Sequence, residues 1–255
     1  MTLIDTHCHM YLPDFEADIS EVVQRARESG VEKCYLPAVD SHTMDQLLGL
    51  ESRFPGFFVA MAGLHPCSVQ ENYLQELELV KSLLARRTFA AVGEIGLDYY
   101  WDRSFDTQQM EAFETQIGWA MQYDLPIVIH SRNSIDECIE VVARHQSGSL
   151  KGIFHCFSGS LEQARKIIGL GFYLGIGGVL TYKKSTLPDV LQHISMDHLV
   201  LETDAPYLPP VPFRGKRNES SFLTFILEKL AHIKGVSAGE AAGMTTSNAK
   251  KIFGT

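Results

Sequence analysis

Short apolar segments alternate along the chain with longer segments that are apolar on one side only. Eight of the short segments read as strands, because they are near-continuously hydrophobic and bounded by turn residues. This character is typical of strands buried on both faces of a parallel sheet. The predicted strands cover residues 3–7, 34–39, 57–63, 89–94, 126–130, 151–155, 172–177 and 198–204.

The segments between these strands have helical spacing. In the first, apolar residues fall at i, i+3, i+4 and i+7 from Ile19 to Ala26, and Gly30 follows as a C-terminal stop. Eight strands alternating with helices predict an α/β fold, a (β/α)8 TIM barrel formed as one domain by residues 1–255. An open doubly wound sheet is the alternative, disfavoured because no G-x-G-x-x-G follows a strand. Further helices are predicted at about 42–53, 73–86, 106–123, 134–145, 160–170 and 186–194, with two more after Ser221.

Composition narrows the class of protein. The chain has 255 residues, of which 45% are hydrophobic and 21% charged, as in ordinary globular proteins. Its apolar runs are shorter than the roughly 20 residues that span a bilayer, so no membrane association is expected. Five singly placed cysteines indicate reduced thiols and a cytoplasmic location. The net charge of −9 opposes sequence-independent gripping of duplex DNA, although a nucleic acid remains a possible substrate. No sequence pattern indicates an oligomeric state.

Ionisable residues stand at the ends of many predicted strands, where apolar residues would cost less to bury. In a (β/α)8 barrel all C-terminal strand ends open on one face, and that face carries the active site. We therefore expect side chains far apart in sequence to converge there. They are His7, His9, His65, Glu94, His130, His155, Glu202 and Asp204.

The H-x-H pair at the first strand is informative in that setting. Strand side chains alternate, so His7 and His9 point the same way and Cys8 points the opposite way. Alone, the pair fits two ordinary hydrogen-bonded histidines better than a metal site. Together with the ionisable residues at the other strand ends, it favours two imidazoles that share a cation.

Neutral imidazole and carboxylate ligands suit zinc, manganese, cobalt or iron, with magnesium where carboxylates and waters dominate. A carboxylate such as Glu94 can bridge two cations, which polarise a scissile group and lower the pKa of a bound water. A carboxylate at the site then takes the proton of that water. The residues therefore predict a metal-dependent hydrolase.

Seven motifs extend this inference over essentially the whole chain. They occur in one family's order and approximate spacing, and the chain resembles that family: the TatD metal-dependent deoxyribonucleases, within the amidohydrolase-like hydrolases. One such motif would be weak evidence, whereas seven in order are highly specific. The motifs are IDTHCH, GLHP, VGEIGLDYY, LPIVIHSR, FHCFSG, LETDAPYL and RGKRNE.

The resemblance implies a two-metal deoxyribonuclease acting on single-stranded DNA from its 3′ end, with Mg²⁺, Zn²⁺ or Mn²⁺ as the cofactors. Glu94 would bridge the metals, and Asp204 would double as the general base. The implied metal ligands are His7, His9, Glu94, His130, His155 and Asp204. The implied substrate-binding residues are His65, Tyr99, Arg132 and Glu202.

Several alternatives accompany this hypothesis. An amidase, an esterase or another phosphoesterase acting on a small substrate would share the barrel and the H-x-H pair. Many such amidohydrolases bridge their metals with a carboxylated lysine at the fourth strand, where this chain has Glu94. A non-catalytic barrel would not need the full ligand set. Ser220 stands where the family commonly has proline, which affects the expected conformation of that loop.

Each of several loop residues near the mouth of the predicted barrel has two possible roles. Tyr100 and Trp101 either pack their own loop or stack on a base. Arg214, Lys216 and Arg217 either lie on a solvated surface or contact phosphate.

Overall fold

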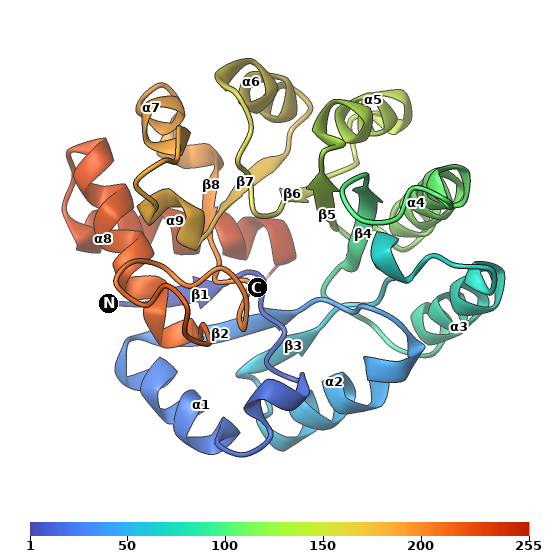
Figure 1. The fold of residues 1–255 in the computed structure, drawn as a ribbon, viewed down its shortest axis with the longest axis horizontal. Coiled ribbons are helices and arrows are strands. Elements are labelled where there is room, and N and C mark those ends of the chain that lie inside the picture. The colour runs from blue at the N-terminus through green and yellow to red at the C-terminus, as the bar shows by residue number, and fades with distance from the viewer. Residues whose placement is uncertain (255) are drawn as a thin grey trace.

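Eight parallel strands form a closed barrel in the computed structural model, which describes residues 1–254. Hydrogen bonds close the barrel where Thr6 N donates to Leu201 O, and a bridge between Ala62 and Val92 joins its two sheets. Figure 1 shows the strands at the centre and the helices around them, which confirms the predicted TIM barrel. The strands are β1 (Leu3–Asp5), β2 (Val31–Leu36), β3 (Phe58–Ala60), β4 (Val92–Asp98), β5 (Ile127–Arg132), β6 (Gly152–Phe154), β7 (Tyr173–Ile176) and β8 (Leu199–Leu201).

The helices follow the predicted pattern closely because local signals mark their ends. Asp40 caps α2 by accepting from Thr43 N, and Ser160 opens α6 with a capping box. Gly235 ends α8 with a left-handed backbone, φ 65°. The helices are α1 (Ile19–Glu28), α2 (Ser41–Arg53), α3 (Tyr73–Arg86), α4 (Asp106–Tyr123), α5 (Ile135–His145), α6 (Leu161–Gly169), α7 (Leu187–Gln192), α8 (Leu223–Lys234) and α9 (Ala238–Phe253). Within residues 1–254, no helix is both long and apolar enough to cross a bilayer.

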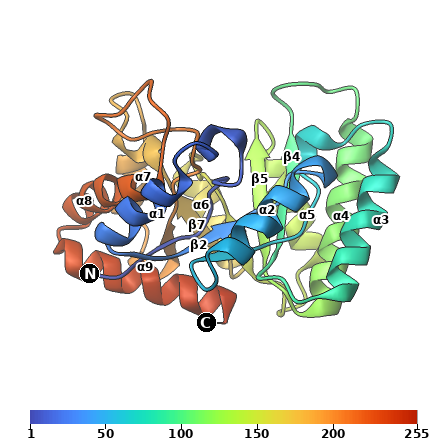
Figure 2. The same ribbon diagram turned by 90° about the horizontal axis from the view of Figure 1, so that it is seen from below.

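The hydrophobic residues form two layers. Inside the barrel, a small cluster from the strands packs against Ala249 and Ile252 of α9. The ring of Phe253 stacks on Tyr35 with centroids 3.7 Å apart. Figure 2 shows α9 running across the bottom of the barrel, so this helix closes that end. The candidate functional side chains lie at the opposite end of the barrel, at the C-terminal ends of the strands.

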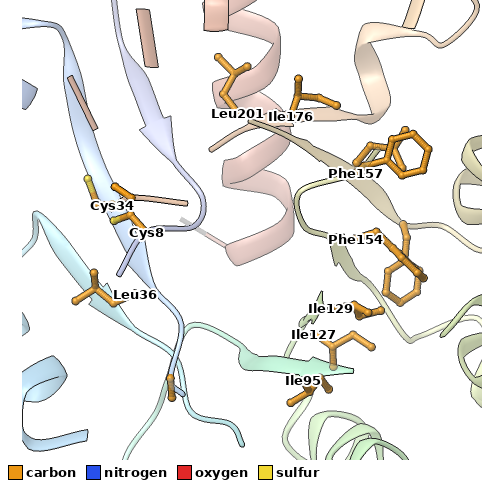
Figure 3. Packing of buried hydrophobic residues seen from close by; sticks show 14 of the residues in the cluster. Cys8, Cys34, Leu36, Ile95, Ile127, Ile129, Phe154, Phe157, Ile176 and Leu201 are labelled. Carbon is orange, nitrogen blue, oxygen red and sulfur yellow. The ribbon is translucent and has the colours of Figure 1, made fainter. Parts of the chain in front are cut away.

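The larger layer lies between the strands and the surrounding helices. Figure 3 shows Ile127, Ile129 and Phe154 on the outer face of their strands. Cys8 lies with Cys34 on the same outer side, as the alternation of strand residues predicts. The same alternation turns His130 toward the interior of the barrel.

The strands differ from their predicted bounds by up to four residues at an end, and the difference in β4 changes the position of a site residue. The sequence predicts a strand over 89–94 that ends at Glu94, whereas β4 continues to Asp98. The extension pairs with the end of β5, where Gly96 lies opposite His130 and Asp98 opposite Arg132. Glu94 therefore lies within β4, deeper in the barrel than a residue at a strand end.

Candidate metal centre

The barrel mouth brings six side chains together from five elements. His7 and His9 follow β1, Glu94 and His130 lie in β4 and β5, His155 follows β6, and Asp204 follows β8. Most of these side chains are buried: Glu94 is 1% exposed and His7 is fully covered. The structure thus places the six residues implied as metal ligands in one cluster (His7, His9, Glu94, His130, His155 and Asp204).

One side of the cluster gathers around the first histidine pair. His7 Nε2 lies 3.1 Å from Glu94 Oε2 and 3.7 Å from Asp204 Oδ1. His9 Nε2 lies 3.5 Å from each of the same two oxygens. The Nε2 atom of each of these two imidazoles therefore lies within 3.7 Å of an oxygen of both carboxylates.

The other side gathers around the second oxygen of Glu94. His130 Nδ1 lies 2.8 Å and His155 Nε2 lies 3.1 Å from Glu94 Oε1. Each oxygen of Glu94 thus faces its own pair of histidines. This is the arrangement that a carboxylate bridging two cations requires.

The electrostatics favour positive charge at this centre. Burial raises the pKa of Glu94, but His155, His65 and His7 outweigh it and hold that pKa well below its ordinary value. Burial lowers the pKa of His155, but Glu94 and Glu202 outweigh it and raise that pKa well above its ordinary value. An ionised carboxylate at such depth is stable only with cationic partners.

Contacts on the far side of three imidazoles, those of His9, His130 and His155, indicate which nitrogen carries the proton. The hydroxyl of Tyr11 donates to Pro37 O at 2.7 Å, so it must accept from His9 Nδ1, 3.0 Å away. The proton of a neutral His9 therefore sits on Nδ1, and Nε2 presents a lone pair to the cluster. That nitrogen is the one 3.5 Å from Glu94 and Asp204.

Carboxylates play the same part behind the other two histidines. Asp98 Oδ2 lies 2.8 Å from His130 Nε2, and Glu202 Oε1 lies 3.2 Å from His155 Nδ1. A carboxylate accepts, so each of these nitrogens carries the proton and the opposite nitrogen presents a lone pair. Carboxylates behind histidines commonly orient metal ligands in this way.

Glu202 is placed beneath His155 and not in contact with the cavity. It is fully buried and accepts from Cys156 N at 2.5 Å. Gly175 makes room for it, because a Cβ at that position would lie 2.1 Å from Glu202 Oε2. The geometry supports an orienting role for Glu202, which the sequence had associated with substrate.

His65 has the opposite arrangement to His9, His130 and His155. Its Nδ1 accepts from the backbone amide of Cys67 at 3.0 Å, so the proton must sit on Nε2. That Nε2–H points into the site, 3.4 Å from Glu94 Oε1. Although His65, Glu94 and His130 bring three potential ligand atoms within 4.8 Å of one another, His65 offers a donor and no lone pair there.

The residues fit a pair of divalent cations. The lone pair of His9 Nε2 faces carboxylate oxygens of Glu94 and Asp204, and all three atoms are acceptors. Buried acceptors that face one another require a proton or a cation between them. The donor set of four imidazoles and two carboxylates suits zinc or manganese better than magnesium.

A cavity of about 680 Å³ opens from this centre to the surface. His65 and Arg132 line it, together with five of the six ligand candidates. Tyr99 instead packs against the hydrophobic core, with the guanidinium of Arg103 4.4 Å above its ring. Of the four residues expected near the substrate, the cavity wall thus includes two.

Residues of the RGKRNE segment anchor the loop after β8 through ion pairs and a hydrogen bond. Arg217 forms a bidentate ion pair with Asp18 before α1, and Glu219 forms another with Arg25 of α1. Asn218 donates to the carbonyl of Tyr207, 2.7 Å away. The guanidinium of Arg217 is therefore used in an ion pair within the protein and is not a free cation at the surface.

Ser220 has a specific role at the position where the family commonly has proline. Its hydroxyl donates to Asp5 Oδ2 at 2.5 Å, a bond that proline cannot form. Asp5 also accepts from Thr203 Oγ1 at 2.6 Å and from His7 N at 3.3 Å. This buried network joins β1 to the chain that carries Asp204.

Three residues near the centre escaped the sequence analysis. Asp98 stands in the GLDYY sequence at the end of β4, so its position signalled a role. Tyr207 likewise stands in the LETDAPYL motif, whereas Tyr11 gave no such signal, because it matters through a partner that only the fold brings near. Tyr11 supports His9, and the ring of Tyr207 lies 6.0 Å from that of His9.

A closed α/β barrel with buried histidines and carboxylates gathered at its strand ends defines a metal-dependent hydrolase. The chain belongs to the TatD related DNase family, whose model matches residues 4–254. It is 37% identical over 252 residues to the uncharacterized metal-dependent hydrolase YabD of Bacillus subtilis, with 98% of each chain covered.

Solved structures agree with this assignment. The crystal structure of YJJV, a TatD homolog from Escherichia coli, superposes with a TM-score of 0.94 at 34% identity, covering 99% of this chain and 98% of that one. A TatD family hydrolase from Entamoeba histolytica gives a TM-score of 0.87 at 24% identity, covering 99% and 98% of the two chains. At 24% identity, the Entamoeba histolytica structure supports the fold alone.

Proposed function

We propose that this protein is a two-metal phosphodiesterase that hydrolyses DNA, acting as a 3′-to-5′ exonuclease on single strands. One observation carries the phosphodiesterase chemistry: each oxygen of Glu94 faces a separate pair of histidines. DNA as substrate is supported by the family description, TatD related DNase. The 3′-to-5′ polarity is supported only by the motif resemblance.

The proposed ligands are His7, His9 and Asp204 on one side and His130 and His155 on the other, with Glu94 between. Two divalent ions held there would polarise the phosphoryl group and supply a water of lowered pKa. Mg²⁺, Zn²⁺ and Mn²⁺ are the candidates, and the four imidazoles favour the latter two.

Asp204 is the proposed general base. Its carboxylate lines the cavity 3.5 Å from His9 Nε2. Burial raises the pKa of Asp204, but its interactions with His9, His155 and His7 outweigh it, so that pKa lies below its ordinary value. The group therefore stays ionised near neutral pH and can accept the proton of the attacking water.

His65 and Arg132 are proposed to act on the phosphate. The Nε2–H of His65 is fixed by Cys67 and points into the cavity, so it can donate to a phosphoryl oxygen. Arg132 brings the fixed charge of a guanidinium to the cavity wall.

The five free cysteines support a cytoplasmic location.

A metal-by-substrate screen tests this function. Metal-stripped protein is reloaded with Mg²⁺, Mn²⁺ or Zn²⁺ and offered end-labelled DNA, RNA, phosphomonoesters, amides and esters. The proposal expects a ladder that shortens from the 3′ end, faster on single than on double strands, and suppressed by chelator. Rapid amide or ester hydrolysis with intact oligonucleotides would contradict it.

A further inference from the structure

Two exposed aromatic rings stand at the rim of the cavity, on opposite sides of the metal centre. Trp101 follows β4 and is 65% exposed, and Tyr207 follows β8 and is 52% exposed. Both line the cavity. In a closed eight-stranded barrel, the fourth and eighth strands are half a circuit apart, so the two rings face the centre from opposite directions.

The backbones of both residues are held firmly although their rings are exposed. Trp101 N donates to Asp98 Oδ1 at 3.3 Å, the carboxylate that also supports His130. Tyr207 N donates to Asp204 O at 2.8 Å, and its own carbonyl accepts from Asn218. The backbone of each residue is therefore held to Asp204 of the metal centre or to Asp98 behind it.

The ring of Trp101 is further oriented by its neighbours. The guanidinium of Arg132 lies 3.8 Å from the ring centroid of Tyr100 and 5.2 Å from that of Trp101. Tyr100 meets Trp101 edge to face at 4.8 Å. An aromatic pair set over a cation is a more ordered surface than a free loop side chain.

Both rings are exposed and line the cavity beside the proposed reaction centre, so they offer flat apolar faces to a ligand bound there. Every nucleobase has a flat π-face that stacks on such rings. Between the rings lie the acceptors of the centre and the Nε2–H of His65, where a phosphodiester belongs under the proposed function. Both rings and these groups line the same cavity, as the binding of a phosphate flanked by two bases requires.

We propose that Trp101 and Tyr207 form a stacking clamp that holds one base on each side of the scissile phosphodiester. This inference rests on the proposed function and specifies its substrate: a strand with a base on both sides of the cleaved bond. Such a clamp is indifferent to base identity, because stacking reads no hydrogen-bonding edge. It selects against phosphomonoesters and small esters, which lack one or both bases.

The test pairs each variant with a substrate that lacks the corresponding base. Trp101→Ala and Tyr207→Ala are assayed on a short oligothymidylate and on the same strand with one abasic residue on either side of the scissile bond. Each variant should lose about 5- to 100-fold in kcat/KM on the intact strand, the range expected for one stacked base. Each should lose nothing further on the strand whose abasic residue removes its own partner.

Matched variants make the result specific. Trp101→Phe and Tyr207→Phe keep a ring and should recover most of the activity. Val211→Ala, which trims another exposed apolar residue of the loop after β8, should behave as the unaltered protein. Equal losses on intact and abasic strands, or no loss on either, would overturn the clamp while leaving the hydrolase intact.

Fluorescence of Trp101 measures the stacking of a base independently of hydrolysis. The chain has two tryptophans, so Trp119→Phe leaves Trp101 as the single reporter. A dinucleotide with a methylphosphonate link, which resists hydrolysis, should quench Trp101 more strongly than the same compound made abasic. Stronger quenching by the intact dinucleotide, if neither the Trp119→Phe nor the unaltered protein cleaves oligonucleotides, would support the clamp and contradict the nuclease. Oligonucleotide cleavage, with equal quenching by the intact and the abasic dinucleotide, would support the nuclease and contradict the clamp.

Discussion

The backbone amide of Cys67 donates to Nδ1 of His65, 3.0 Å away, and so fixes the ring proton on Nε2. His65 is thereby a hydrogen-bond donor among histidines whose inward nitrogens are acceptors. The distinction cannot be made from residue type, because an imidazole has both capacities. It separates a substrate contact from a metal ligand and leads to the first prediction.

His65→Gln should keep much of the activity, whereas His65→Asn and His65→Ala should lower kcat by about 10²- to 10³-fold, the cost of one lost donor to a developing charge. The amide nitrogen of Gln reaches about as far as Nε2, and that of Asn reaches only as far as Nδ1. Elemental analysis should find the same metal content in all three variants. A fall in bound metal would instead make His65 a ligand.

Asp98→Asn should weaken metal binding about 10- to 100-fold, measured by competition with a chelator. The Oδ1 of Asn can still accept from Tyr100 N, but its amide group would face His130 Nε2–H donor to donor. His130 would then move its proton to Nδ1, the nitrogen that faces Glu94.

A neighbouring carboxylate serves as the control for Asp98. Asp102→Asn alters an acid of the same loop, one that accepts from Ser104 N. It should leave metal affinity unchanged. If both variants lose metal equally, the effect belongs to the loop and not to the pairing with His130.

Glu94→Gln should bind fewer metal ions per chain than Glu94→Asp and should have the lower activity. Glutamine keeps the reach of the side chain but loses its charge, whereas aspartate keeps the charge and loses one methylene. A bridge between two cations depends first on charge. Metal content per chain and turnover, measured on the same preparations, check this; equal losses would argue against bridging.

Asp204→Asn should reduce kcat by about 10²- to 10⁴-fold with little change in KM, as expected when a general base is removed. Because Asp204 also faces His9, the metal content must be measured with the kinetics. Full metal content with low kcat assigns the loss to proton transfer. A raised KM with normal kcat would place Asp204 in substrate binding.

Glu219→Gln should destabilise the protein most at neutral pH. Burial raises the pKa of Glu219, but hydrogen bonds from Arg25 and Ser221 outweigh it and lower that pKa below its ordinary 4.5 in the folded state. A lowered folded pKa stabilises the fold above pH 4.5, and the stabilisation disappears as pH falls through the folded value. The loss at pH 7 should be about 1 kcal/mol, because Arg25 is partly exposed.

Thermal unfolding in chelator measures this difference, which corresponds to about 2–4 °C in Tm for a chain of this size. The difference between Glu219→Gln and the unaltered protein should shrink as the pH is lowered below 4.5. Glu228→Gln, an exposed acid of α8, is the control and should show no such dependence. A constant difference from pH 7 to pH 3 would show that the charge of Glu219 is not responsible.

Most of the fold followed from local patterns. Helices such as α3 and α4 have the predicted bounds, because amphipathic spacing and their end residues act over a few positions. The outward direction of Cys8 followed from its alternation with His7 and His9. The extra length of β4 did not, because it depends on pairing with β5 and not on the residues of β4 alone.

The candidate site was predictable in its composition but not in its supporting contacts. Strand ends of a barrel converge whatever their sequences, so eight ionisable residues were expected at the mouth without coordinates. The motif resemblance then implied six of them as ligands. Glu202 was expected near the substrate, whereas the fold places it beneath His155, in space that Gly175 leaves free. Tyr11 supports His9 only because Pro37, after β2, lies beside it.

The closure of the barrel between β1 and β8 bears on how the protein is made. Thr6 and Leu201 are bonded across 195 residues of sequence, and His7 and Asp204 meet at the same seam. A ribosome adding 5–20 residues per second needs about 10–40 s between those two positions. During that interval His7 and His9 have no carboxylate from β8 to complete their half of the centre. Metal binding at this half of the centre is therefore expected only after β8 has been synthesised.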